Sequence, residues 1–108
     1  MISQERMEKA LTYLADTDKQ YGILRGMIEG LEHNLKIIEA QGIVNFQGTG
    51  GVDYIKSMSR TSDDYKHLVS KIEEMSIEYH TLAAKRNTED TVIKCWQSLN
   101  ANKRVGLK

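Results

Sequence analysis

The residues of this chain that could do chemistry are few, and their spacing does not bring them together. Three histidines could bind a metal ion or carry protons if their imidazoles met: His33, His67 and His80. His67 and His80 are thirteen residues apart, which on a helix is nearly four turns, and no metal-ligand motif is present. We therefore expect no metal ion and no cofactor.

The residues that nucleophilic catalysis or phosphate binding would need are also missing from the sequence. No base is predicted beside Cys95, the only cysteine, so we expect a small buried or half-buried apolar residue next to Trp96. Asp63 and Asp64 fit the start of a helix better than a general acid and base. The glycine-rich GTGGVDY is not followed by the Lys and Ser or Thr of a phosphate loop. The sequence predicts a protein that is not an enzyme.

The composition is typical of one soluble, ordered domain. The chain has 108 residues, no proline and 28% charged residues, which leaves room for a single domain. One cysteine allows no internal disulfide, the opening MISQERMEK lacks the apolar stretch of a signal peptide, and no stretch is long enough to span a membrane. We expect a cytoplasmic protein without a membrane contact. Because a thin helical monomer of this length buries little surface, we also expect a homo-oligomer.

Two long helices must position whatever surface this chain presents. In the first half, two rows of residues repeat every seven positions, which predicts the a and d positions of a coiled-coil seam. These rows are Met7, Leu14, Tyr21, Ile28 and Leu35, and Ala10, Thr17, Leu24, Leu31 and Ile38. The second half has the rows Tyr65, Ile72, Tyr79, Arg86 and Ile93, and Leu68, Met75, Leu82, Glu89 and Trp96. The pattern predicts an all-α fold, an antiparallel hairpin of two long helices.

The ends of the helices follow from capping residues and glycines. We expect one domain over 1–108, with helix over 4–40, a connection over 41–60, helix over 62–101 and a basic tail over 102–108. Ser3 is a suitable cap for the first helix, and Thr61 or Ser62 for the second. Gly42 is expected to close the first helix. The stretch VDYIKSMSR should add a short helix, and three apolar residues should pack onto the hairpin end: Ile43, Val44 and Phe46.

A polar layer interrupts the seam at Thr17, Arg86 and Glu89. In an antiparallel register in which facing residue numbers sum to about 103, Thr17 lies opposite Arg86. Asp16 or Asp18 could then neutralise the guanidinium, as a buried charge requires. We interpret this layer as a device that fixes the register; a binding notch is the alternative.

The same place in the hairpin carries two sequences that resemble helix starts. These are ADTD, residues 15–18, and NTED, residues 87–90. They predict a kink or break near 15–18 and 86–90.

Three glycines stand four residues apart within the first predicted helix. Each of Gly22, Gly26 and Gly30 should cost about 1 kcal/mol relative to alanine. Their heptad positions lie away from the seam, and Ile23 and Met27 add apolar surface beside them. We interpret these five residues as an interface for a second copy or for a target; a tolerated, locally flexible helix is the alternative.

Charge is uneven although the formal net charge is zero. Residues 61–93 carry four basic and seven acidic side chains. The candidate acidic contact face consists of Asp63, Asp64, Glu73, Glu74 and Glu78. The last fifteen residues carry four basic side chains and no acidic one, and these are candidate nucleic-acid contacts: Lys94, Lys103, Arg104 and Lys108. For the acidic set the alternative is an ordinary solvated helix face. For the basic set it is the favourable placement of positive charge near the C-terminal end of a helix.

The C-terminal half, YHTLAAKRNTEDTVIKCWQSLNANKR, resembles a group of small uncharacterised proteins from tailed phages and their prophages. Members share a Tyr-rich second helix, a Lys-Arg pair before an acidic helix turn, and a tryptophan followed by a Ser-Leu-Asn-Ala-Asn-like end. The N-terminal ALTYLADTD with its long Leu-rich helix is similar too, so the resemblance covers most of the chain. The resemblance implies a setting among early recombination and replication genes. The three glycines are not part of it.

These observations lead to three functional hypotheses. The first is a non-catalytic, phage-encoded interaction protein that binds host or phage nucleic-acid machinery and inhibits a host defence nuclease. The second is an accessory of recombination or single-stranded DNA binding, in which Trp96 and the basic end contact bases and phosphates; the acidic balance of the rest disfavours it. The third is a structural coiled-coil oligomer or assembly chaperone.

Overall fold

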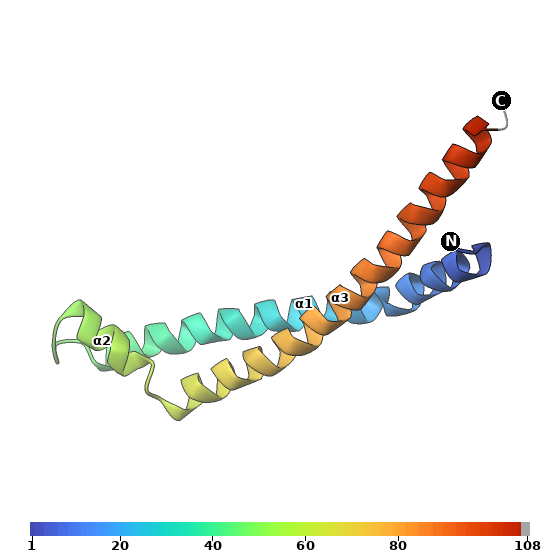
Figure 1. Ribbon diagram of the computed structural model, residues 1–108. Coiled ribbons are helices and arrows are strands. Elements are labelled where there is room, and N and C mark those ends of the chain that lie inside the picture. Colours follow the sequence, from blue (N-terminus) through green and yellow to red (C-terminus); the bar gives the residue numbers. More distant parts are fainter. Residues whose placement is uncertain (107–108) are drawn as a thin grey trace. The chain divides into compact units, whose positions relative to one another are not determined.

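The computed structural model describes residues 1–106, with side chains through Lys103, as three α-helices (Figure 1). Helix α1 spans Gln4–Asn45, α2 spans Val52–Ser59 and α3 spans Asp63–Gly106. No strand occurs among the described residues. The two long helices pack against each other in opposite directions, which confirms the predicted all-α hairpin with a short extra helix in its connection.

The chain divides into two compact units. The terminal unit combines Met1–Gly22 with Tyr79–Lys108, and the central unit is the continuous segment Ile23–Glu78. The terminal unit is therefore made of the first part of α1 and the last part of α3. The central unit holds the rest of both helices together with α2.

The core of the terminal unit is formed by the predicted seam residues. Met7, Ala10 and Ile93 are buried, and the half-buried Leu14 and Trp96 pack against them together with Val92. Ala10 is fully buried, and its small side chain lets the two helices approach closely. Apolar burial of this kind contributes most of the stability of a helix pair, because packing of the apolar sides stabilises helices in proteins more than intrinsic helix propensity does.

The core of the central unit continues the same two rows. Leu24 is buried, and the other seam residues of this unit are half-buried: Ile28, Leu31, Leu35 and Ile38 on α1, and Tyr65, Leu68, Ile72 and Met75 on α3. The residue that follows α2, Arg60, forms an ion pair with Glu39 of α1 at 3.1 Å. This contact and the packing of Ser59 fasten α2 to α1.

The helix starts are capped as predicted. The backbone N–H of Arg6 donates to Ser3 Oγ at 3.1 Å, and that of Tyr65 donates to Ser62 Oγ at 3.1 Å. Each hydroxyl thereby satisfies one of the N–H groups that a first helical turn leaves unpaired.

The predicted end of the first helix is wrong, because α1 continues through Gly42 to Asn45. Gly42 is needed for close approach instead: a Cβ there would lie 2.6 Å from Ser59 Cβ and 2.8 Å from Ser59 Cα. The left-handed conformation occurs later, at Gly48, with a φ of 86°.

Two further expectations about the ends of the helices are corrected. Val44 does not pack onto the hairpin end but is 68% exposed, although Ile43 and Phe46 are half-buried. Residues 102–106 do not form a separate tail, because α3 extends through them. Lys108 lies outside the described residues.

Of the kink or break predicted near 15–18 and 86–90, the break does not occur, since both helices run through these segments without interruption. The kink stays a prediction. The reason that no break occurs lies in the threonine hydroxyls. Thr17 Oγ1 donates to the carbonyl of Tyr13 at 2.8 Å, and Thr88 Oγ1 donates to that of Ala84 at 3.1 Å. Each hydroxyl therefore bonds back along its own helix and does not cap a new one.

Candidate functional site

A polar cluster centred on Arg86 lies within the terminal unit. The Arg86 side chain is 16% exposed. Its Nη1 donates to Thr17 Oγ1 at 2.7 Å and to the carbonyl oxygen of Leu14 at 2.9 Å, and its Nη2 forms an ion pair with Asp18 Oδ1 at 2.9 Å. The predicted contact between Thr17 and Arg86 is therefore present, with Asp18 rather than Asp16 as the neutralising carboxylate.

Two tyrosines extend this cluster. The guanidinium carbon of Arg86 lies 4.8 Å from the ring centroid of Tyr21, within cation–π range. The rings of Tyr21 and Tyr79 lie 4.9 Å apart, and the Tyr79 hydroxyl donates to that of Tyr21 at 3.0 Å. Because Arg86 is held by its own chain in several directions, the arrangement favours a register-fixing role over a binding notch.

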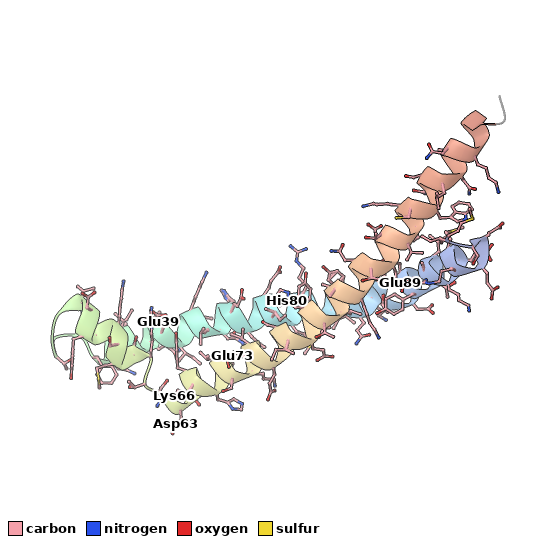
Figure 2. All side chains as sticks on the ribbon, viewed as in Figure 1. Glu39, Asp63, Lys66, Glu73, His80 and Glu89 are labelled. Carbon is pink, nitrogen blue, oxygen red and sulfur yellow. The ribbon has the colours of Figure 1, made fainter. Side chains whose placement is uncertain are left out.

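Glu89, predicted in the same layer, instead forms an ion pair with Arg6. The pair is bidentate: Nη1 lies 2.6 Å from Oε2 and Nη2 lies 2.9 Å from Oε1. Figure 2 shows Glu89 on α3 beside the N-terminal part of α1. The hydrogen bond from Arg6 lowers the pKa of Glu89, and the same bond raises the pKa of Arg6. The heptad pattern did not predict this pair, because Arg6 and Glu89 do not face each other in the predicted register. The long side chain of Arg6 reaches Glu89 by extending along the seam.

The Arg6–Glu89 pair predicts an acid-dependent loss of stability. Because the pKa of Glu89 is lower in the folded chain than its ordinary value of 4.5, the pair stabilises the fold above that value. The contribution is lost as the pH falls through the lowered pKa. We expect the free energy of unfolding of the wild type to fall more steeply below pH 4.5 than that of Glu89→Gln, measured by urea denaturation at one protein concentration. Glu32→Gln, on an exposed site, should instead follow the wild type; a Glu89→Gln curve parallel to the wild type would contradict the prediction.

The candidate interface residues lie on the outer side of α1. A Cβ at Gly22, Gly26 or Gly30 would meet no atom within 4 Å. Ile23 is 50% exposed and Met27 is 49% exposed. Their predicted position away from the seam is thus confirmed, while their role as an interface remains a prediction.

The candidate acidic residues are all exposed on α3 in the central unit: Asp63, Asp64, Glu73, Glu74 and Glu78. None of them forms an ion pair within the described part of the chain. Two lysines, Lys66 and Lys71, are exposed among them, and Figure 2 shows Asp63, Lys66 and Glu73 along this stretch. The segment from Asp63 to Glu78 carries five carboxylates against these two ammonium groups.

The candidate nucleic-acid residues do not form a stacking platform. Trp96 is half-buried against the terminal core. Lys94 forms an ion pair with Asp90 at 2.8 Å, and this hydrogen bond raises the pKa of Lys94. Lys103 is exposed, whereas the side chain of Arg104 and all of Lys108 lie outside the described residues.

The expectation for Cys95 is wrong, because this residue is exposed. Cys95 is two positions beyond the seam residue Ile93, and that offset turns its side chain off the helix contact. It lines a cavity of about 470 Å³ with residues that include Ile2 and Val92.

The three histidines are the remaining candidates for reactive side chains. His33, His67 and His80 are exposed, and the imidazole ring of His80 lies 5.3 Å from the ring of Tyr79, centroid to centroid, in a T-shaped arrangement. Within residues 1–106 no three His, Cys, Asp or Glu side chains gather as a metal site would need, and no helix has an apolar stretch long enough to cross a membrane. Comparison of the chain with protein families, curated proteins and solved structures gives no match.

Proposed function

We propose that this chain is a non-catalytic, phage-encoded helical interaction protein that binds a host or phage protein of nucleic-acid metabolism. In this proposal the acidic side of α3 in the central unit occupies the basic channel in which that protein binds DNA or RNA. Inhibition of a host defence nuclease is the form of the activity that we favour. The observation that carries the proposal is the set of five exposed carboxylates with no ion-pair partner in the described chain.

The placement of these carboxylates suits a nucleic-acid channel. Asp63 and Glu78 are fifteen residues apart, so the acidic stretch extends over about 22 Å of helix. A channel that binds nucleic acid is lined by Lys and Arg, and its positive potential attracts any rigid array of negative charges. Because the carboxylates stand on a formed helix, little backbone entropy is lost when they bind.

The alternative of a single-stranded DNA accessory has less support. It needs an exposed aromatic ring beside free cations, yet Trp96 packs against the core and Lys94 is paired with Asp90. The third hypothesis, a structural coiled-coil oligomer, is compatible with the proposal, because its candidate interface lies on α1 and the acidic residues lie on α3.

The test compares two neutralised variants that lose the same number of charges. The first is Glu73→Gln, Glu74→Gln and Glu78→Gln combined, on α3; the matched control is Glu8→Gln, Asp16→Asn and Glu32→Gln combined, on α1. All six side chains are exposed. Tagged proteins are incubated with nuclease-treated bacterial lysate, and bound proteins are identified by mass spectrometry. A captured nuclease or recombination protein is then purified for binding and activity assays.

We expect the wild type and the α1 control to bind a nucleic-acid enzyme with similar affinity and to inhibit it. The α3 variant should bind at least tenfold more weakly. Raising the salt concentration should also weaken binding of the wild type, because salt screens the attraction between opposite charges. The proposal fails if no nuclease or recombination protein is recovered, or if the α3 variant binds the recovered protein as tightly as the control.

A further inference from the structure

One side of α1 in the central unit carries no charged side chain from Ile23 to Val44. Its apolar members are exposed: Ile23 to 50%, Met27 to 49%, Ile37 to 43% and Val44 to 68%. The five charged residues of the same stretch lie on other sides of the helix: Arg25, Glu29, Glu32, Lys36 and Glu39. An uncharged, partly apolar side along about six turns is unusual for a helix face in water.

The heptad explains how this side is built. With Tyr21 and Ile28 at position a, the residues Ile23, Gly30, Ile37 and Val44 all occupy position c. They form a third row at seven-residue spacing, outside the a and d rows that contact α3 within the hairpin. Rows f and g flank it on the helix surface and are uncharged over the same stretch.

We propose that a second copy of this chain covers this row, with the two α1 helices antiparallel about a two-fold axis. Gly30 of each copy then faces Ile37 of the other, and Ile23 faces Val44. An interface of this symmetry must be complementary to itself, and here each isoleucine side chain at position 37 meets a glycine. A Cβ at Gly30 meets nothing within its own chain, so the space beside it is open to the partner.

Charge complementarity selects this register over its neighbours. Glu29 and Lys36 both occupy position b, at the border of the uncharged side. In the proposed register, Glu29 of one copy lies opposite Lys36 of the other, twice over by symmetry. A shift of seven residues in one direction would bring the two Glu29 carboxylates together, and a shift in the other direction would bring the two Lys36 ammonium groups together. Like charges placed opposite each other are unfavourable.

The ion pair that Glu29 makes within its own chain does not conflict with this arrangement. Arg25 lies 3.3 Å from Glu29, and both side chains are largely exposed, at 71% and 65%. An ionised carboxylate accepts several hydrogen bonds, so Glu29 can bind the lysine of a second copy as well. Near the two-fold axis, His33 and Asn34 of each copy approach their own equivalents in the other copy, and neither of them is an acidic or permanently charged side chain.

The test is a charge exchange followed by mass measurement. Sedimentation equilibrium at pH 8 gives the dimer dissociation constant for the wild type, Lys36→Glu, and Glu29→Lys combined with Lys36→Glu. Lys36→Glu should weaken the dimer at least tenfold, since it places Glu29 against a second carboxylate. The double exchange should restore affinity to within about threefold of the wild type, because it only reverses the direction of the pair.

A second variant tests the packing of the row. Gly30→Gln should form a good helix and keep the monomer folded, but it fills the space for Ile37 of the second copy and should weaken the dimer at least tenfold. Ala101→Gln places the same side chain at an exposed position of α3 in the terminal unit and should leave the dimer intact. Circular dichroism checks that each variant keeps its helix content.

Three results would overturn the proposal: a monomeric wild type at 100 μM, a dimer that tolerates both Lys36→Glu and Gly30→Gln, or a double exchange that does not restore association. The inference does not depend on the proposed function. The dimer variants alter α1 only, so capture of a nucleic-acid enzyme by the α3 carboxylates is measured independently with the same proteins.

Discussion

Replacing Arg86 with alanine should lower the free energy of unfolding by about 2–3 kcal/mol, the range for loss of hydrogen bonds to a charged group in a partly dry site. The guanidinium binds Thr17, the carbonyl of Leu14 and Asp18, and it stacks on Tyr21. Removing it leaves the Leu14 carbonyl without this donor and a space beside the tyrosine ring. Arg86→Lys should recover less than half of the loss, because one ammonium group lacks the planar fork that reaches all these partners.

Urea denaturation followed by circular dichroism measures this effect. All variants are compared at one protein concentration, because association would otherwise alter the apparent stability. Arg25→Ala serves as the matched control: Arg25 forms an exposed pair with Glu29, and its loss should change the free energy by less than about 0.5 kcal/mol. An Arg86→Ala protein as stable as the Arg25→Ala protein would show that the cluster does not hold the two helices together.

Two glycines of α1 should respond to alanine with opposite signs. At Gly42 the new Cβ would lie 2.8 Å from the Cα of Ser59, a backbone atom, so α2 must move away. Ser59 is 2% exposed and its hydroxyl donates to the carbonyl of Lys56 at 2.7 Å, which leaves it little freedom to yield. We expect a net loss of about 1–3 kcal/mol, in the range for overpacking. At Gly26 the Cβ meets nothing, so alanine should stabilise the chain by up to about 1 kcal/mol through its helix propensity.

Comparing Gly42→Ala with Gly26→Ala isolates the effect of the contact between Gly42 and α2. Both substitutions are made in the same helix, so the difference between them reports the clash rather than helix propensity. Combining Gly42→Ala with Ser59→Gly, which removes the opposing Cβ, should recover part of the loss. A stabilising Gly42→Ala would mean that α2 does not pack at this point of α1.

The seam was predictable because it depends on residue type and spacing alone. Seven-residue repeats fix which side of each helix is apolar, and the contact of Thr17 with Arg86 follows because each interrupts its own row. Other features depend on partners that the local pattern does not specify. A glycine at position 42 is compatible with the end of a helix and also with close packing against another segment. Only the position of Ser59 in the folded chain decides between the two.

The two errors at polar residues have a similar physical origin. A threonine near the start of an acidic stretch can cap a new helix or bond back to the carbonyl four residues earlier, and Thr17 and Thr88 do the latter. Glu89 was assigned to the layer of Arg86 by its row, but a long cation, Arg6, reaches it from another level of the seam. The uncharged side of α1 is predictable only in part: the heptad places Ile23 and Met27 away from the seam, but the apolar Val44 suggests packing onto the hairpin end, where it is in fact 68% exposed.

Trp96 gives this protein an optical reporter of one unit. It is the only tryptophan, and it packs against Met7, Ala10 and Ile93 within the terminal unit. Its emission spectrum therefore responds to solvent entering that core, while the central unit holds no indole and is silent at the same wavelengths. Ellipticity at 222 nm, by contrast, registers the helices of both units. Whether the two signals change together on heating tells directly if the halves of this hairpin melt as one cooperative body or in sequence.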